Sequence, residues 1–275
     1  MTATIDGADG AFQRRPVSVA GRDATSEWGI AVETPVEIRL NGAPWIVMLA
    51  SPSDVEDLAV GLAVTEGLVA DAGAVEKISV RSWLGEVSVD LIVPIDQLRA
   101  PARDARSLAG NAGCGLCGLE SLAALHRRQQ AGQGAAGGIQ AISDEAITAA
   151  FASLPEFQPI NRETHSVHAA AWCHPDGRIQ LVREDVGRHN ALDKLVGARA
   201  RQLQLGEAGF IVMTSRCSYE LVSKAAAAGA MLLATISAPT TLALTWSQSL
   251  GLPLACRGPG RTIVRFPEEV AHAAG

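Results

Sequence analysis

Hydrophobic and polar residues alternate over much of the first hundred positions. Segments 36–40 and 45–49 alternate on either side of Asn41-Gly42, a dipeptide that is favoured in two-residue hairpin turns. Alternation returns at 78–80 and 87–91. The pattern therefore predicts two pairs of β-strands in this part of the chain.

A helical period interrupts these strands. Apolar residues recur at helical spacing over Val55–Ala63, and Gly67 follows shortly after the last of them. Ser53, with Glu56 three residues later, has the spacing of a capping box. We predict a helix that begins at this box and ends before the glycine.

The second half of the chain has a different order. Strand-like runs at 167–173, 178–182, 210–214 and 232–236 are mixed with helix-like runs at 190–204, 219–228 and 240–249. Strands that alternate with helices imply parallel strands joined by right-handed crossovers. This half is therefore predicted to be an α/β sheet.

Four parts follow from these patterns. Residues 1–28 are polar and contain glycine, and we predict a flexible tail. Residues 29–110 form a small α+β lobe, and residues 111–138 form a mobile loop with a helix and a glycine-rich linker. Residues 139–275 form the larger α/β core.

Composition narrows the class of protein. The chain has 275 residues, 48% of them hydrophobic, and a net charge of −6 at pH 7. This charge provides no basic field for nucleic acid or an anionic membrane. No apolar run approaches the roughly 20 residues of a membrane span, and residues 1–15 lack the order of a signal peptide. We expect a cytoplasmic protein with no nucleic-acid or membrane partner.

Reactive chemistry is concentrated in Gly113–Gly118, which reads Gly-Cys-Gly-Leu-Cys-Gly. A helix-like run at 119–130 follows, and a helix N-terminus lowers the pKa of a thiol. The glycines keep both sulfurs accessible. Cys114 and Cys117 are therefore predicted to be reactive. A redox dithiol, half of a zinc site and a persulfide carrier all use this spacing, which does not separate them.

The other cysteines have a simpler interpretation. Five cysteines, an odd number, suit reduced thiols better than a disulfide framework. We predict that Cys173, Cys217 and Cys256 are small buried residues. His165 and His168 lie close to Cys173 in the sequence, but on a strand this spacing directs them to opposite faces, so we predict no metal site. The roles of His165, Cys173 and Cys217 remain open.

Charge gathers in segment 183–194, which holds seven ionisable residues in twelve positions. The segment follows a predicted strand, where the loops of an α/β sheet bind ligands. Loops 214–216 and 237–240 occupy similar positions and offer hydroxyls, N–H groups and the guanidinium of Arg216, which suits phosphate. Alternatively, the hydroxyls of Ser218 and of Ser237 or Thr240 only cap helices.

Four segments resemble those of a known family. They are Cys114–Gly118, Arg183–Lys194, Tyr219–Ala228 and Ser237–Thr240. In sequence and in order they resemble the signature segments of the formate dehydrogenase accessory sulfurtransferase family, FdhD. The resemblance covers about residues 35–266 and is far more specific than two cysteines alone.

The resemblance implies a cytidine-deaminase-like α/β sandwich in the second half, and a cytoplasmic homodimer. It implies a sulfurtransferase that takes sulfane sulfur from a cysteine desulfurase as a cysteine persulfide. The sulfur then goes to the molybdenum cofactor, a bis-molybdopterin guanine dinucleotide, for the catalytic subunit of formate dehydrogenase. No permanently bound metal is implied, nor deaminase activity, because Ala169-Ala170 follow His168 where a deaminase has His-x-Glu.

The resemblance also assigns residues. Cys114 would carry the persulfide, with Cys117 as its partner thiol. The family's cofactor-binding stretch corresponds to Cys256, Arg257, Gly258, Pro259, Gly260 and Arg261. Further cofactor contacts are predicted for Asp185, Arg188, His189, Ser215, Arg216 and Ser237.

This chain departs from the family pattern at three places. The family usually reads Thr-Gly-Gly where Thr164-His165-Ser166 stands here, and Ser-Gly-Arg where Thr214-Ser215-Arg216 stands. Fewer glycines are expected to tighten the pocket. The stretch Arg257–Arg261 is slightly longer than the common form.

Two other functions stay open. A dithiol oxidoreductase would cycle Cys114 and Cys117 through a disulfide, so that loss of either cysteine would be equally inactivating. A non-catalytic molybdenum-cofactor chaperone would bind the dinucleotide and tolerate the loss of both thiols. The donor desulfurase, the target dehydrogenase and the choice of molybdenum or tungsten are also left open.

Overall fold

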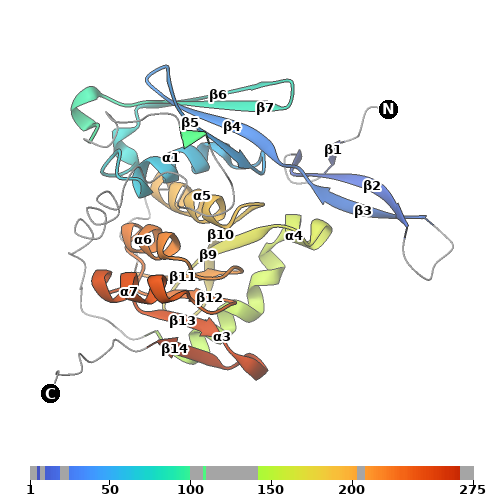
Figure 1. Ribbon diagram of the computed structural model, residues 1–275, viewed down its shortest axis with the longest axis vertical. Coiled ribbons are helices and arrows are strands. Elements are labelled where there is room, and N and C mark those ends of the chain that lie inside the picture. Colours follow the sequence, from blue (N-terminus) through green and yellow to red (C-terminus); the bar gives the residue numbers. More distant parts are fainter. Residues whose placement is uncertain are drawn as a thin grey trace.

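The computed structural model describes residues 10–18, 25–99, 142–202 and 208–266, together with the short strands 5–6 and 108–109. Two large sheets lie at opposite ends of the molecule, with two helices, α1 and α5, between them (Figure 1). A third, small sheet extends to one side. In the described part of the chain, no helix has the length and apolar character that crossing a membrane requires.

The five-stranded sheet has the order β6-β7-β4-β5-β8. Its strands are β4 (Thr34–Leu40), β5 (Ala43–Ala50), β6 (Lys77–Trp83), β7 (Glu86–Ile92) and β8 (Leu108–Ala109). Val36 and Ile38 are buried in one core cluster with Leu58 of α1 (Val55–Thr65). Asn41 and Gly42 have φ values of 51° and 79°, as the hairpin turn requires. The strands predicted in this region are confirmed.

The start of α1 differs from the capping-box prediction. The helix is capped by Asp54 in a left-handed conformation with φ 52°, and its side chain makes no capping hydrogen bond within the described chain. Ser53 is buried, and its Oγ has no hydrogen-bond partner among the described residues. Tertiary contacts account for the missing capping box. The nearby Ser51 is held at the end of β10, where its N–H donates to Asp185 and its Oγ accepts the N–H of Val186.

The six-stranded sheet has the order β10-β9-β11-β12-β13-β14. Its strands are β9 (His168–Cys173), β10 (Ile179–Asp185), β11 (Phe210–Met213), β12 (Leu233–Thr235), β13 (Leu254–Arg257) and β14 (Ile263–Phe266). Only the neighbours among β11, β12 and β13 are parallel; the other pairs are antiparallel. The predicted parallel order holds for β11, β12 and β13 but is wrong for β9, which is antiparallel to both of its neighbours. The turn at His174–Gly177 joins β9 to β10.

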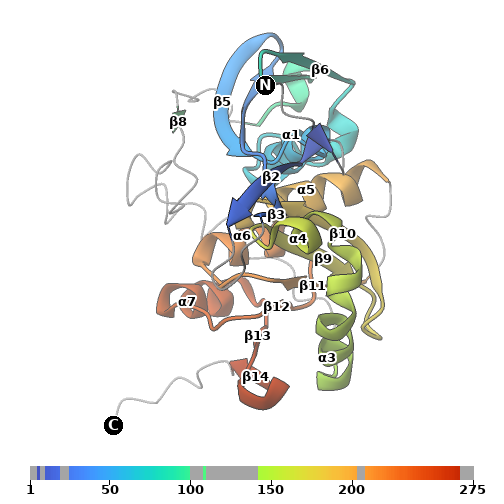
Figure 2. The same cartoon turned by 90° about the vertical axis from the view of Figure 1, so that its right-hand side faces the viewer.

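Helices cover both faces of this sheet (Figures 1 and 2). α5 (Arg188–Arg201), α6 (Tyr219–Ala227) and α7 (Thr241–Leu250) lie on one face, and α3 (Asp144–Ser153) lies on the other. Along β11, Ile211 and Met213 pack in the core cluster under α5, α6 and α7. Phe210 and Val212 point to the other face and pack in the cluster under α3. This is the α/β sandwich that the sequence predicts. Short 3₁₀ helices are η2 (Ala72–Ala74), η3 (Ile95–Gln97), η5 (Leu154–Phe157) and η6 (Pro259–Arg261).

The small sheet lies where a flexible tail is predicted. It consists of β1 (Ile5–Asp6), β2 (Phe12–Ser18) and β3 (Thr25–Ala31), and its hairpin projects from the body (Figure 1). β3 packs tightly on α4 (Pro159–Thr164), since a Cβ on Gly29 would lie 2.5 Å from the carbonyl oxygen of Glu163. Arg14 also pairs with Glu163 at 2.7 Å. The tail prediction is wrong for residues 12–18 and 25–28, which these contacts hold in strands.

α1 and α5 approach each other at the level of their backbones. A Cβ on Gly61 would lie 1.8 Å from the carbonyl oxygen of Asp193, and one on Gly197 would lie 1.9 Å from that of Asp57. Only glycine fits at either position. This contact attaches the five-stranded sheet and α1 to the α/β core.

Candidate functional site

The strand register brings the ends of several strands to one edge of the six-stranded sheet. Asp185 at the end of β10 lies opposite His168 at the start of β9. Met213 at the end of β11 lies opposite Thr235 of β12, which in turn lies opposite Cys256 of β13. β9 is antiparallel to both β10 and β11, so β10 runs in the same direction as β11 and β12. The chain therefore leaves all three strands at the same edge of the sheet.

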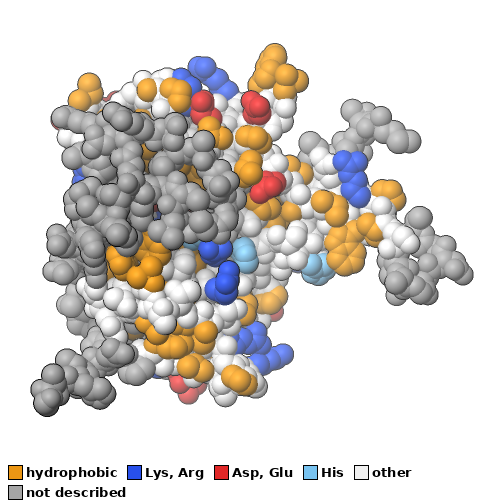
Figure 3. All heavy atoms as spheres, viewed as in Figure 1, with side chains coloured by type: hydrophobic (Ala, Val, Ile, Leu, Met, Phe, Trp, Pro, Cys, Tyr) orange, Lys and Arg blue, Asp and Glu red, His pale blue; other side chains and the backbone are white. Residues whose placement is uncertain are grey.

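The predicted binding residues therefore gather at this edge, which we call the sheet-edge site. It comprises His168, Arg188, His189, Thr214–Ser218, Glu220, Ser237–Thr240 and Arg257–Arg261. Arg216, Ser237 and Arg261 are exposed, whereas Arg188 and His189 are half-buried. Figure 3 shows Lys, Arg and His side chains close together near the middle of the visible face. The α5, α6 and α7 helices all begin here, so their N-termini add N–H groups that suit an anion.

Two of these loops are tied to each other. The backbone N–H of Ser237 donates to the carbonyl of Ser215 at 3.3 Å, and that of Thr240 donates to the carbonyl of Cys217 at 3.1 Å. Ser215 is buried, and its hydroxyl donates to the carbonyl of Arg216 at 3.0 Å. The loops after β11 and β12 thus form one connected surface, on which Arg216 rather than Ser215 is open to solvent.

Of the hydroxyls of Ser218 and Thr240, that of Thr240 caps a helix. The Thr240 Oγ1 accepts the N–H of Ala243 at 3.2 Å and caps α7. Ser218 is at the N-cap of α6 but makes no side-chain cap bond in the described structure. Its Oγ instead lies 3.3 Å from Nε2 of His189, and Glu220 Oε2 lies 3.0 Å from the same nitrogen.

His168 stands in a positive part of the sheet-edge site. Burial lowers the pKa of its imidazole, and the charges of Arg188 and His189 lower it further, whereas Asp185 opposes this shift. The ring is therefore neutral at pH 7. Arg188 supplies positive charge to this part of the edge.

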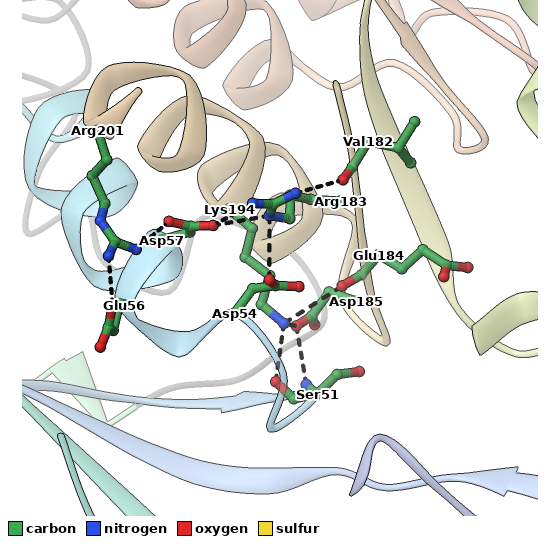
Figure 4. Close-up of polar contacts among 10 residues, drawn as sticks. All are labelled: Ser51, Asp54, Glu56, Asp57, Val182, Arg183, Glu184, Asp185, Lys194 and Arg201. Carbon is green, nitrogen blue, oxygen red and sulfur yellow. Dashed lines mark hydrogen bonds and ion pairs between the residues drawn. The ribbon is translucent and has the colours of Figure 1, made fainter. Parts of the chain in front are cut away.

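Asp185 has a structural role that differs from the predicted ligand contact. Its side chain is fully buried and forms an ion pair of 2.6 Å with the fully buried Lys194 (Figure 4). Asp185 also accepts hydrogen bonds from the N–H of Ser51 at 3.0 Å and from the amide of Asn190 at 3.0 Å. These partners use its oxygens, so the carboxylate holds the loop before α5 in place instead of facing a ligand.

Other charges of segment 183–194 are structural as well. Glu184 accepts the N–H groups of Ile160 at 2.8 Å and Asn161 at 2.9 Å, and burial raises the pKa of its carboxyl. Arg183 pairs with Asp57 of α1 at 2.7 Å (Figure 4). The charge density that suggested a ligand site therefore also serves the junction between the two halves.

The three described cysteines are buried and carry free thiols, as the sequence predicts. Burial raises the pKa of the Cys173 thiol to about 12, and burial together with the neighbouring Cys256 raises that of Cys217 to about 12. Burial also raises the pKa of Cys256. These thiols are protonated at neutral pH and are poor nucleophiles. Cys114 and Cys117 lie outside the described residues, and their roles stay predictions.

His165 does not lie on a strand. It follows the last residue of α4 in a left-handed conformation with φ 52°, and its exposed ring lies 5.4 Å from that of Trp28. The argument that His165 and His168 alternate along one strand is therefore wrong. Within the described ranges, no group of three His, Cys, Asp or Glu residues is arranged to hold a metal ion.

The FdhD/NarQ family model matches residues 31–268. The chain belongs to the FdhD/NarQ family. It is 44% identical over 234 residues to the "Sulfur carrier protein FdhD" of Xanthomonas euvesicatoria pv. vesicatoria, covering 85% of this chain and 82% of that protein. It is 45% identical over 233 residues to the protein of the same name from Chromobacterium violaceum, covering 84% and 86%.

A solved structure of similar fold is a putative formate dehydrogenase accessory protein from Desulfotalea psychrophila. The two share a TM-score of 0.65 and 20% sequence identity, covering 92% of this chain and 95% of that one. At this identity the likeness establishes that this FdhD/NarQ protein has the same fold.

Glu220 is a residue of the sheet-edge site that sequence reasoning missed. Its local signal is an acidic residue in the first turn of a helix, which ordinarily favours its own helix N-terminus. The contact to His189 on α5 is tertiary and has no counterpart in local spacing. Glu220 also borders a cavity of about 450 Å³ between α1, α6 and the end of α7.

Proposed function

We propose that this FdhD/NarQ protein is a sulfurtransferase that carries sulfane sulfur as a persulfide on Cys114. A cysteine desulfurase supplies the sulfur, and the acceptor is the molybdenum cofactor, a bis-molybdopterin guanine dinucleotide, which formate dehydrogenase needs for activity. The protein works in the cytoplasm as a homodimer. The relatives named sulfur carrier proteins, at 44–45% identity, support this function.

The burial of Cys173, Cys217 and Cys256 decides which cysteines can carry the persulfide. A persulfide carrier needs an accessible thiolate. Cys173 and Cys217 are buried with a pKa of about 12, and Cys256 is buried as well. Among the five cysteines, Cys114 and Cys117 are left for this chemistry.

The transfer takes place in two balanced steps. The Cys114 thiolate attacks the terminal sulfur of the donor's persulfide, the donor's S–S bond breaks, and the donor leaves as a thiolate. The terminal sulfur then moves from Cys114 to the metal of the substrate cofactor. Because a neutral sulfur atom is transferred, the metal supplies the two electrons that make it a sulfido ligand, and Cys114 leaves as a thiolate.

The sheet-edge site is the proposed seat of the dinucleotide. Arg188, Arg216, Arg257 and Arg261 supply guanidinium groups for the phosphates, next to three helix N-termini. His189 and Ser237 supply further polar contacts. This donor set fits a ligand with several phosphates, and the buried Asp185 is not part of it.

Mass spectrometry tests the carrier mechanism. The reduced protein is incubated with a cysteine desulfurase and cysteine, and the intact chain and its peptides are weighed. We expect one added sulfur on Cys114 that disappears when the guanine-nucleotide cofactor is added. Cys114→Ser should abolish loading, Cys117→Ser should keep part of it, and the buried-site control Cys173→Ala should load normally.

Two outcomes would contradict the proposal. A protein that binds the cofactor but never gains sulfur is a chaperone. A protein in which Cys114→Ser and Cys117→Ser are equally inactive, and in which the two thiols cycle through a disulfide, is an oxidoreductase.

A further inference from the structure

Glu220 connects the first turns of two helices at the sheet-edge site. It is the second residue of α6, and its Oε2 lies 3.0 Å from Nε2 of His189, the second residue of α5. The Glu220 side chain is 12% exposed and that of His189 is 15% exposed. The contact is thus largely shielded from water, and a hydrogen bond there is stronger than one on an open surface.

The contact fixes which nitrogen of His189 carries the proton. A carboxylate only accepts hydrogen bonds, so the nitrogen that faces Glu220 is the donor. The Ser218 Oγ, 3.3 Å from the same Nε2, can accept as well. Nε2 is therefore protonated, which leaves Nδ1 as the nitrogen that can accept a further hydrogen bond.

The surrounding charges leave this task to Glu220. His189 lies close enough to His168 on β9 to affect its pKa, and Arg188 and Asp185 act on the same His168. Asp185 is engaged by Lys194, Ser51 and Asn190. Within the described structure, Ser218 and Glu220, both of the segment that begins α6, contact the His189 ring.

We propose that Glu220 is a positioning residue that holds the imidazole of His189 with Nδ1 free to accept a hydrogen bond from the guanine nucleotide of the cofactor. The donor is a ring N–H of the base or a ribose hydroxyl. Glu220 itself does not touch the ligand. The inference rests on the proposed function, because it assumes that the sheet-edge site binds that nucleotide.

A double-mutant cycle on the full chain tests the inference, with GDP as the probe in isothermal titration calorimetry. We expect Glu220→Ala and His189→Ala each to weaken GDP binding about tenfold, and the double variant to be no weaker than either single one. Glu145→Ala is the matched control, since Glu145 is also in the first turn of a helix, α3, away from the edge. Its affinity should be unchanged.

Nitrogen NMR of the histidine rings supplies the readout that a merely structural role would not move. His189 should show the Nε2-protonated form in the unliganded protein and a mixture of both tautomers in Glu220→Ala, where the Ser218 Oγ is left to accept from Nε2. Glu220→Gln should keep it, because the amide oxygen still accepts from Nε2. If Glu220→Ala does not fold, the His189 tautomer and GDP affinity of Glu220→Gln still test the inference.

Three outcomes would overturn the inference. The first is additive losses in the double variant, which would mean that Glu220 acts separately from His189. The second is an unchanged His189 tautomer in Glu220→Ala. The third is a lack of GDP binding by the unaltered chain, which removes the nucleotide from the sheet-edge site, whereas sulfur loading on Cys114 is decided separately by mass spectrometry.

Discussion

His168 begins β9 with its imidazole partly buried beside Arg188 and His189. Burial first, and then the neighbouring Arg188 and His189, lower the pKa of the ring from its ordinary value of 6.5. In the unfolded chain these influences are lost. Below pH 6.5 the unfolded chain therefore binds a proton on His168 that the folded protein does not bind, so acidification favours unfolding.

We expect the free energy of unfolding to fall as the pH is lowered from about 7 to about 5, with His168 as one source of the slope. His168→Gln should make the slope shallower, because glutamine takes up no proton. Urea denaturation at several pH values measures this. The exposed His165→Gln is the control and should keep the original slope. An unchanged slope in His168→Gln would contradict the assignment.

At this scale the sequence predicts which residues lie near the carboxyl ends of the strands, but it does not separate their roles. Arg188, His189 and Arg216 lie at the predicted edge. The sequence predicts Asp185 as a ligand contact and does not reveal its structural role, because its partner Ser51 comes from a distant part of the chain. Local spacing cannot anticipate such a pair. Glu220 was missed for the same reason, since its contact to His189 joins two helices.

The glycine contact between α1 and α5 can be tested at the scale of the element. Gly61→Ala would place a methyl group 1.8 Å from the carbonyl oxygen of Asp193, so the two helices must separate. We expect a loss of about 3 kcal/mol or more in the free energy of unfolding, measured by urea denaturation.

Gly251→Ala is the control for that substitution. Gly251 caps α7 with φ 64°, and a Cβ there meets nothing within 4 Å. Its cost is conformational only, about 1–2 kcal/mol. An equal loss in the two variants would mean that the helices yield and that the close approach is not a constraint.

Most elements were predictable because their periods are local. The hairpin of β4 and β5, the helices α5 to α7 and the short apolar strands all follow from hydrophobic spacing. β2 and β3 were missed, because an exposed hairpin has little hydrophobic alternation and is held by α4. The direction of β9 against β11 was also missed, since pairing is decided across the sheet and not along the chain.

At the scale of the molecule, polar junctions join the two large sheets in addition to the glycines. Asp57 of α1 pairs with Arg183 at 2.7 Å and with Arg201 at 2.5 Å (Figure 4). Lys224 of α6 pairs with the buried Asp193 at 2.8 Å. Thr65 of α1 donates to the same carboxylate at 2.7 Å. Breaking one partner of such a buried pair leaves a charge without compensation.

We therefore expect the five-stranded sheet and the α/β core to unfold in one transition. The fluorine NMR signals of fluorotryptophan at Trp45, in the first, and at Trp172, in the second, should disappear at the same urea concentration. Trp28 on the projecting hairpin is the control for local change, since it is exposed. Loss of the Trp45 signal well before that of Trp172 would show that the halves unfold separately.

The backbone contact at Gly61 and Gly197 also limits how this protein can be recombined with its relatives. A chimera that takes the five-stranded sheet and α1 from one parent and the core from another must receive glycine from both, because each half supplies one side of the contact. It must also retain an arginine or lysine opposite Asp57. Compatibility between parents is thus decided at a few positions on two helices, and overall sequence identity is a poor guide to it.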